Sequence, residues 1–364
     1  MKIILTTSRH YPFDKPYADS LRFEKILEAL TEAGNEILIV GKNNKLKFEQ
    51  KKNVFLIPSS SHRFIGEMLL LALAPIYMSK IIKITAPDVI YCYSIFYSLF
   101  LRYVKKRDYK IHLDILGIEH KEKNKSGKTW LLSKILASLE MSSVKKADLI
   151  TTVNYAHKKI ISGFTKKPIV VLRDAVEDKY LKSTKSSHNS KELIFVGSIA
   201  NRRLDDLFRA LQENNEKLSG LRVKIVGDGK DLDFYKNAAK KINFSFEFCG
   251  YVPHERALGM IERASFCFSD DWSTIGFPSK VFEYMGMGKA SIVEDTSATR
   301  EIIEDGKTGI LYNSPSDLGL KISRLMNDKG FARKIESNAF KVIKFKHTWS
   351  IRKKELVKIY KGLK

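Results

Sequence analysis

Residues 266–293 read FCFSDDWSTIGFPSKVFEYMGMGKASIV, and this stretch holds the unit from which the fold can be predicted. Short apolar runs at 266–268 and 291–293 predict two strands, and 280–287 predicts a helix that ends at Gly288. A glycine-containing loop joins the first strand to the helix. Because open parallel sheets bind ligands at the carboxyl ends of their strands, this loop is the first candidate for a binding site.

The same alternation of strand and helix extends in both directions from this stretch. Further strands are predicted at 2–7, 37–40, 54–57, 89–93, 110–114, 149–153, 193–196, 223–226 and 246–248. After the first of them, apolar residues recur at the spacing of one helix face, at Phe23, Ile26, Leu27 and Leu30. A polar run, KSTKSSHNSK at 182–191, interrupts the pattern and is the best candidate for a boundary region. A length of 364 residues also favours two domains. The sequence therefore predicts an α/β protein with doubly wound parallel sheets.

The composition restricts the class of protein. The net charge is +23, and residues 1–172 hold 29 basic and 15 acidic residues, so the excess is denser in the first half. Such a balance favours anionic partners, although a solvated lysine-rich surface explains it equally well. Three scattered cysteines without a CxxC pair make a disulfide framework or a structural zinc site unexpected.

No membrane-spanning segment is expected from the apolar runs. The longest of them covers 68–78, eleven residues with Pro75 inside it, whereas a span needs about 20. The N-terminal residues MKIILTTSRHYPF are too short in apolar content for a signal peptide, and we interpret them as the first strand.

The helix predicted after the loop has features that suit a nucleotide. It begins near Pro278 and Ser279, and a helix N-terminus attracts a diphosphate. Lys280 lies in the first turn, where a cation disfavours the helix itself, which hints at an anionic ligand. Glu283 follows one turn later, within reach of ribose hydroxyls. An ordinary βαβ unit with a surface lysine is the alternative, and spacing alone favours it.

The segment PSKVFEYMGMGK resembles the nucleotide-sugar-binding region of glycosyltransferase family 4, whose members have the two-domain GT-B fold. Similarity to that family recurs in the expected order along the chain, at ADLITTVN (147–154), LIFVGSIANRRLDDLFRAL (193–211), LRVKIVGDG (221–229), FEFCGYVP (246–253), TREIIEDGKTGIL (299–311) and TWSIRKKELVKIY (348–360). The resemblance implies two Rossmann-like domains facing a cleft. Residues 1–172 with a crossing helix at 346–364 would bind the acceptor, and residues 173–345 would bind the donor.

The resemblance also implies an activity. Members of the family are retaining enzymes, so we expect transfer of a hexose from a UDP- or GDP-sugar to a lipid-linked or polysaccharide acceptor in cell-envelope glycan biosynthesis. Neither a cofactor nor a metal is expected, because fixed cations can stabilise the diphosphate leaving group. Asp231 and Asp233 form an Asp-x-Asp pair, but they open a helix and are interpreted as capping residues. The Gly227-Asp228-Gly229 run lacks the third glycine of a dinucleotide fingerprint.

Site residues follow from the resemblance position by position. Glu283 matches the second glutamate of the family's Glu-x7-Glu pattern, which holds the ribose, whereas the first falls on Ile275. Arg203 matches a basic residue that contacts the diphosphate, and Arg202 is expected to replace a companion that is Ser198 here. The expected donor-binding residues are Glu283, Pro278, Ser279, Phe277, Gly276, Ile275, Arg202, Gly197 and Tyr251, with Asp271 as a further source of sugar contacts.

Two segments of the first half are expected to face the ligands. Asp114 ends the predicted strand 110–114 and His120 follows in the next loop, and His120 resembles a histidine that some family members place beside the donor sugar. A surface histidine in a polar loop is the alternative. The expected catalytic residues are Arg203, Lys280, His120 and Asp114, and the expected acceptor-binding residues, in the loop after the first strand, are Tyr11, Lys15 and Tyr17.

Two further segments suggest a membrane partner. The stretch 63–83 is mostly apolar, and 129–146 is amphipathic with lysines on both sides. With the charge excess, they predict a cytoplasmic protein held peripherally at an anionic inner membrane face, unless both are ordinary core helices. Two other functions stay open: a nucleotide-sugar epimerase of the same fold, and a basic nucleic-acid-binding protein. The second lacks a recognised module, so no nucleic-acid partner is expected.

Overall fold

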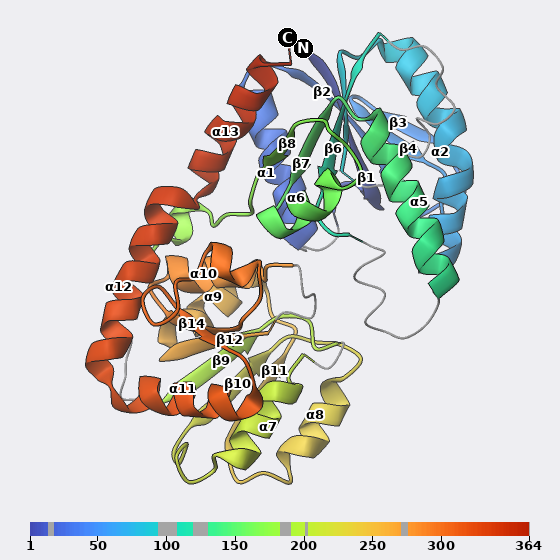
Figure 1. Cartoon of the computed structure of the whole chain (residues 1–364). Coiled ribbons are helices and arrows are strands. Elements are labelled where there is room, and N and C mark those ends of the chain that lie inside the picture. The colour runs from blue at the N-terminus through green and yellow to red at the C-terminus, as the bar shows by residue number, and fades with distance from the viewer. Residues whose placement is uncertain are drawn as a thin grey trace. The chain divides into compact units, whose positions relative to one another are not determined.

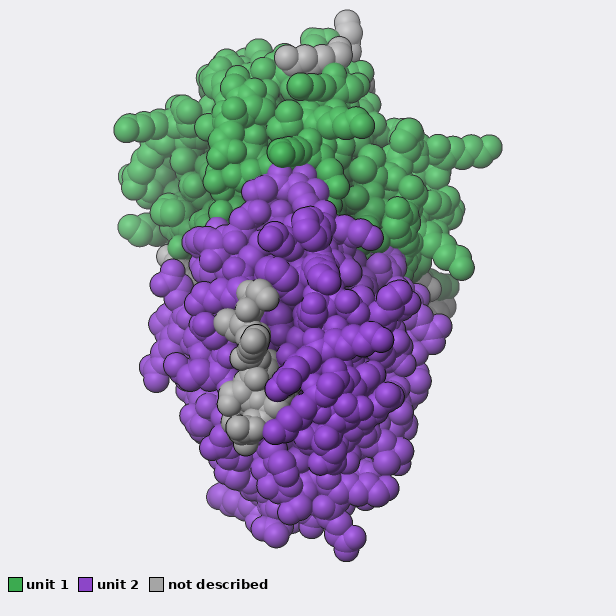
Figure 2. All heavy atoms as spheres, turned by 90° about the vertical axis from the view of Figure 1, so that its left-hand side faces the viewer, with its two compact units in different colours: residues 1–173, 352–364 green, residues 174–351 purple. Residues whose placement is uncertain are grey.

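Two sheets, each within its own unit, organise the chain (Figure 1). The computed structural model describes residues 1–13, 18–93, 108–118, 130–182, 191–200, 203–270 and 276–363. Unit 1 comprises 1–173 and 352–364, and unit 2 comprises 174–351 (Figure 2). The second boundary therefore lies six residues beyond the expected 345/346. The reason is local, because the Trp349 N–H donates to the Val176 carbonyl at 3.0 Å and keeps this stretch with unit 2.

Unit 1 contains an eight-stranded sheet of order β3-β4-β2-β1-β5-β6-β7-β8. All neighbours are parallel except β3 and β4. The bounds are β1 Lys2–His10, β2 Glu36–Lys42, β3 Glu49–Lys51, β4 Val54–Ile57, β5 Val89–Cys92, β6 Lys110–Ile115, β7 Leu149–Thr152 and β8 Ile169–Val171. The predicted parallel α/β class is confirmed. Strands β3 and β8 were not predicted, and β3, with the sequence EQK, contains no apolar residue.

Helices cover both faces of this sheet. The bounds are α1 Ala18–Glu32, α2 Arg63–Thr85, α5 Trp130–Lys146, α6 Tyr155–Ser162 and α13 Trp349–Lys361. Figure 1 shows α1 and α13 on one face and α2 and α5 on the other. The core beneath α1 contains Phe23, Ile26 and Leu30, and α13 contributes Leu356 and Tyr360 to the same cluster. The helical spacing predicted for α1 is therefore confirmed.

Helix α2 extends beyond the apolar run at 68–78 in both directions. Residues Ile65–Thr85 form 21 helical residues with a mean hydropathy of 1.6, so length and composition alone would let this helix cross a membrane. The uninterrupted apolar run is shorter than the helix, because Glu67 precedes it and Ser79 follows it. Only 28% of this stretch is buried inside the protein.

Unit 2 contains a parallel six-stranded sheet of order β11-β10-β9-β12-β13-β14. Its strands are β9 Glu192–Val196, β10 Arg222–Val226, β11 Ser245–Gly250, β12 Phe266–Ser269, β13 Ala290–Glu294 and β14 Ile310–Tyr312. Its helices are α7 Asp205–Glu213, α8 Leu232–Ala239, α9 His254–Arg263, α10 Lys280–Gly286, α11 Pro315–Asn327 and α12 Lys329–Lys346, with short 3₁₀ turns at Asp178–Tyr180 and Thr299–Glu301. The predicted strands and helix of 266–293 are all present.

A buried polar network lies in the core of unit 1. Arg22 of α1 pairs with Asp114 of β6 through two hydrogen bonds of 3.1 and 3.2 Å. The Tyr91 and Thr151 hydroxyls each donate to the same carboxylate at 2.6 Å. Burial alone raises the pKa of the Asp114 carboxyl, but the Arg22 charge and His112 outweigh it, so the pKa is lowered. The network therefore keeps Asp114 ionised.

His112 links this network to α13. Its Nε2 lies 2.8 Å from the Thr151 hydroxyl and its Nδ1 lies 2.9 Å from the Tyr360 hydroxyl. Because the Thr151 proton goes to Asp114, the Thr151 oxygen accepts from Nε2–H, which leaves Nδ1 to accept from Tyr360. This arrangement suits a neutral imidazole. Burial is the main cause that lowers the pKa of His112 to about 4.

The first prediction concerns acid stability. The unfolded chain takes up a proton on His112 below about pH 6.5, whereas the folded chain does so only near pH 4, so stability falls as the pH falls through that window. The drop in pKa corresponds to about 3 kcal/mol. Between pH 7.5 and 4.5 the free energy of unfolding, measured in urea, should decrease in both proteins. The decrease should be about 2–3 kcal/mol smaller in His112→Gln than in the parent chain. The exposed His62→Gln is the matched control. Equal losses in all three proteins would contradict a buried neutral His112.

Candidate functional site

The strand order of unit 2 indicates where a ligand would bind at the carboxyl edge of the sheet. From β9 the chain proceeds to β10 and β11 on one side, then returns to β12, β13 and β14 on the other. Strands β9 and β12 are therefore neighbours at which the direction of winding reverses. Their connections diverge to opposite faces, and doubly wound sheets bind ligands at such a position.

Arg203 and Asp270 meet at this switch point. Arg203 follows β9 and Asp270 follows β12. The Arg203 Nε lies 3.2 Å from the Asp270 Oδ1, and its Nη2 donates to the Asp270 carbonyl at 2.9 Å. The guanidinium also lies over the Phe195 ring, 5.4 Å from its centre. Arg203 is thus held in place beside the ends of both strands.

Asp270 has an unusual acidity for an ion-paired carboxylate. Burial is the largest cause, and it raises the pKa of this carboxyl to about 7. The Arg203 charge acts in the opposite direction, while the charges of Glu294 and Asp206 add to the rise. Near neutral pH, Asp270 therefore exists in both protonation states. Asp270 was not predicted from the sequence, where its only signal is an acidic side chain directly after an apolar strand.

Glycine backbones pack closely beside Arg203. A Cβ at Gly227, whose φ is +142°, would lie 1.8 Å from the Gly197 carbonyl oxygen. A Cβ at Gly229 would lie 2.2 Å from the Ile199 carbonyl oxygen. The loops after β9 and β10 therefore touch through their main chains, which requires glycine at both positions. The expected site residue Gly197 lies in this contact, and a Cβ there would lie 3.3 Å from the Arg203 Nη1.

A second cluster of polar side chains is centred on Glu283. The Lys280 Nζ donates to both Glu283 carboxylate oxygens at 2.9 and 3.0 Å, and the His254 Nε2 lies 3.0 Å from the Glu283 Oε1. The Tyr180 ring packs edge-on against His254. Burial alone raises the pKa of Glu283, but Lys280 and His254 outweigh it and lower the pKa. Glu283 is therefore a fixed carboxylate, and His254 is a contact that the sequence analysis missed.

The two groups are connected through Tyr284. Its buried hydroxyl accepts from the Val196 N–H at 2.9 Å, and Val196 is the last residue of β9, directly before Gly197. Glu283 and Lys280 lie on the same short helix, α10. The hydroxyl bond thus anchors α10 at the strand end that precedes Arg203. The fold of unit 2 thus places four expected site residues at the carboxyl edge of its sheet: Gly197, Arg203, Lys280 and Glu283.

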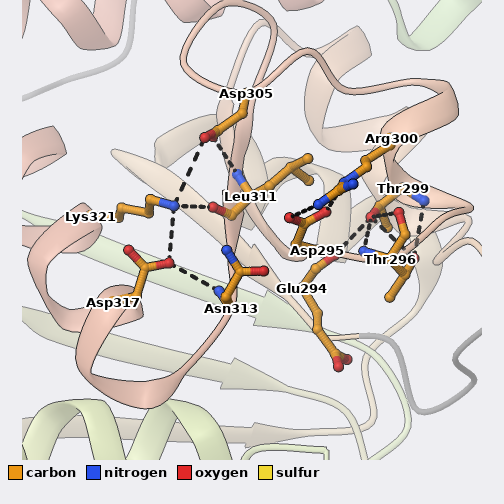
Figure 3. A network of polar contacts seen from close by, with 10 residues as sticks. All are labelled: Glu294, Asp295, Thr296, Thr299, Arg300, Asp305, Leu311, Asn313, Asp317 and Lys321. Carbon is orange, nitrogen blue, oxygen red and sulfur yellow. Dashed lines mark hydrogen bonds and ion pairs between the residues drawn. The ribbon is translucent and has the colours of Figure 1, made fainter.

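The loop after β13 is fixed by local contacts at the same edge (Figure 3). Asp295 pairs with Arg300 through contacts of 2.5 and 2.7 Å. Thr296 and Thr299 cap each other, because each N–H donates to the hydroxyl of the other at 2.8 and 3.1 Å. Figure 3 shows the Glu294 carboxylate directed away from both sets of contacts. The main chain of Glu294 takes part in these contacts, because its carbonyl accepts from the Thr299 hydroxyl at 2.8 Å.

Asp114 corrects one expectation. We expected it to face a ligand, but its side chain is buried and its carboxylate accepts from Arg22, Tyr91 and Thr151. These bonds occupy both carboxylate oxygens, so Asp114 has a structural role in the core of unit 1. Sequence periodicity could not reveal this, because the partners come from α1, β5 and β7.

The remaining expected residues fall into three groups. Tyr11 packs edge-on against Phe13, 5.3 Å between ring centres, so part of its surface belongs to an aromatic cluster. Phe277 packs on the Phe282 ring at 4.7 Å, and Gly276, Phe277, Pro278 and Ser279 directly precede α10, whereas Tyr251 after β11 is exposed. The expected residues Lys15, Tyr17, His120, Arg202 and Ile275, and also Asp271, lie outside the described residues. Within the described ranges, no group of three or more His, Cys, Asp or Glu side chains could hold a metal ion.

A known protein family matches unit 2, which contains the site described above. Residues 176–342 match the family model of glycosyl transferases group 1. The match covers the switch point, α9 and α10, and thus Arg203, Asp270, His254 and Glu283. The chain is also 26% identical over 281 residues to an uncharacterized glycosyltransferase of Methanocaldococcus jannaschii, covering 72% of this chain and 70% of that protein.

Solved structures extend the glycosyltransferase likeness to the whole fold. The Anabaena protein HepE in complex with UDP-glucose matches with a TM-score of 0.74 and 14% identity, over 100% of both chains. A lipopolysaccharide outer core galactosyltransferase matches with a TM-score of 0.72 and 16% identity, over 99% of this chain and 100% of that one. The fold is therefore GT-B, as the resemblance implied. Identities this low carry the fold and no more.

The second prediction tests the group around Glu283. If this carboxylate holds the ribose of a nucleotide, Glu283→Ala should weaken binding of a nucleoside diphosphate at least about tenfold, because a hydrogen bond to a charged group contributes about 1.5–3 kcal/mol. Lys280→Ala should weaken it as well. Titration calorimetry measures the dissociation constants. Glu255→Gln, an exposed carboxylate next to His254, is the matched control. Parental affinity in Glu283→Ala would exclude this group from the nucleotide site.

Proposed function

We propose that the chain transfers a hexose from a UDP- or GDP-sugar to a lipid-linked or polysaccharide acceptor of cell-envelope biosynthesis, with retention of anomeric configuration. Unit 2 holds the donor and unit 1 binds the acceptor. The observation that carries the proposal is the placement of Arg203 and Glu283 at one strand end, through the bond from Tyr284 to β9. A cation for a diphosphate and a carboxylate for a ribose are thereby fixed together.

The roles follow from charge. Cleavage of the sugar–phosphate bond places negative charge on the diphosphate, and Arg203 stabilises it from the switch point. Gly197 has no side chain beside the Arg203 guanidinium, where a Cβ would lie 3.3 Å from Nη1, so a diphosphate on Arg203 can approach the main chain. Glu283, already ionised by Lys280 and His254, accepts hydrogen bonds from ribose hydroxyls. The acceptor hydroxyl passes its proton to the leaving phosphate, so no separate base is required.

Two likenesses support the choice of substrates. HepE was solved with UDP-glucose, and the outer core galactosyltransferase acts, by its name, on lipopolysaccharide. For this chain the base, the sugar and the acceptor stay proposals. The absence of a cofactor or a metal requirement also stays a prediction.

Donor binding is coupled to the uptake of a proton by Asp270. In the free protein Arg203 pairs with Asp270, and the guanidinium offsets part of the rise that burial causes, so that the pKa of this carboxyl is about 7. A diphosphate that draws Arg203 to itself removes that compensation and adds negative charge nearby. Both effects raise the pKa of Asp270, so the carboxyl binds a proton. This neutral form leaves no unpaired buried charge beside the diphosphate.

The third prediction measures this proton. Binding of an intact nucleotide sugar, whose diphosphate diester does not titrate near pH 7, should take up about half a proton at pH 7. Affinity should therefore fall as the pH rises above 7. Calorimetry in two buffers of different ionisation enthalpy counts the protons. Asp270→Asn should abolish the uptake, while Asp233→Asn, a highly exposed carboxylate on α8, should retain it. Uptake that persists in Asp270→Asn would assign the proton elsewhere.

The fourth prediction tests the reaction. A thermal-shift screen of UDP- and GDP-sugars identifies the donor, because a bound ligand raises the melting temperature. With that donor, free nucleoside diphosphate should appear only when an acceptor glycan or glycolipid is added. Arg203→Ala should lower kcat/KM at least about tenfold. Nucleotide release or sugar epimerisation without an acceptor would favour an epimerase instead. Binding of nucleic acid but of no nucleotide sugar would overturn the proposal.

A further inference from the structure

The outer face of α2 in unit 1 is apolar although it is exposed. Ile65, Met68 and Ile76 have exposed fractions of 50, 54 and 53%, and Ile84 reaches 77%. These side chains recur at helical spacing, whereas the opposite face of α2 is buried and contains Leu70, Ala74, Met78 and Ile81. A helix on a water-exposed surface normally carries polar residues on its outer face. The second apolar face of α2 therefore needs a partner.

A neighbouring loop extends this apolar surface. Leu46 has an exposed fraction of 76%. Two residues later, the Phe48 ring stacks on the Tyr77 ring of α2 with 5.0 Å between the ring centres. This contact fixes the loop beside the middle of the helix, next to Ile76. The surface formed by α2 and residues 45–48 is called the α2 surface below.

The charge around the α2 surface is positive. Residues 42–85 contain eight lysines and arginines but only two acidic residues. Lys45 and Lys47 flank Leu46, and Lys80 and Lys83 lie in the last turns of α2, all of them exposed. A second copy of this chain would bring like charges together at the same surface. An anionic lipid bilayer instead matches both the apolar side chains and the lysines.

We propose that the α2 surface inserts into the headgroup region of an anionic bilayer. The outer side chains of α2 and Leu46 reach the acyl boundary, and the lysines contact the lipid phosphates. The helix lies along the membrane and does not cross it, because its inner face is part of unit 1. Its first turn is attached there, since the Ser59 hydroxyl donates to the Gly66 carbonyl at 2.9 Å. A Cβ at Gly66 would lie only 2.5 Å from the Ser60 carbonyl oxygen, so the contact is close.

This inference goes beyond sugar transfer and does not depend on it. That the lysine-flanked segment 129–146 also contacts the membrane stays a prediction. That the membrane face is cytoplasmic stays a prediction.

Vesicle flotation of the full-length chain tests the proposal. The probes are neutral phosphatidylcholine vesicles and vesicles of phosphatidylcholine with phosphatidylglycerol. The chain should float with the anionic vesicles, bind the neutral ones at least about tenfold more weakly, and be released in part by high salt, because the lysine contribution is screened.

Two sets of variants separate the α2 surface from the rest of the chain. The triple variant Ile65→Ser, Met68→Ser and Ile76→Ser should weaken binding to anionic vesicles at least about tenfold, since binding scales with the apolar area inserted. Leu320→Ser with Phe345→Ser is the matched control, because these exposed apolar residues lie in unit 2. Lys80→Glu with Lys83→Glu should also reduce binding, whereas Lys240→Glu with Lys241→Glu should not. All substituted side chains are exposed, and unchanged melting temperatures confirm that the variants fold.

Three outcomes would overturn the proposal. The first is parental vesicle binding by the triple variant, and the second is no binding by the parent chain. The third is a lipid-free dimer in analytical ultracentrifugation that the triple variant converts to monomer, which would assign the α2 surface to a second copy of the chain.

Discussion

In a parallel sheet all strands end on the same edge, and this constraint determines where the chemistry of unit 2 can lie. Arg203, Asp270 and Glu294 are far apart in the sequence, yet each follows the end of a strand or closes it. The parallel sheet alone does not fix the position of helix α10 at that edge. The Tyr284 hydroxyl bonds it to the main chain of Val196, so that Glu283 is held near the same strand end. The donor site proposed above exists only because both conditions are met.

Lys280 at the start of α10 shows that an ion pair within one helix can look, in the sequence, like a residue that binds an anionic ligand. A cation there is unfavourable to the helix dipole, and from the sequence it indicated a missing anion. In the structure both oxygens of Glu283, one turn later, accept from the Lys280 ammonium. The pair explains Lys280 without a ligand. It also supplies the ionised carboxylate that a ribose requires, so the two interpretations are compatible.

The sequence predicted what depends on local pattern. The strands of 266–293, the face of α1 and the parallel class follow from periodicity, and Glu283 follows from a motif. It could not predict what depends on tertiary contacts. Asp114 was placed in a site because it lies near a strand end, but Arg22 from α1 and Thr151 from β7 enclose it. Asp270 and His254 were missed for the same reason, since their partners Arg203 and Glu283 lie 67 and 29 residues away.

Helix α13 has a consequence for the order in which the protein is made. It begins in unit 2, and its later residues complete the core of unit 1 through Leu356 and Tyr360. Its Lys353 also pairs with Glu28 of α1 at 2.6 Å. During synthesis, residues 1–173 therefore leave the ribosome without their last helix, while the whole of unit 2 is continuous and can fold as it emerges. The N-terminal unit is translated first but completed last, and a ribosome that stalls before residue 352 releases a chain with an open hydrophobic core.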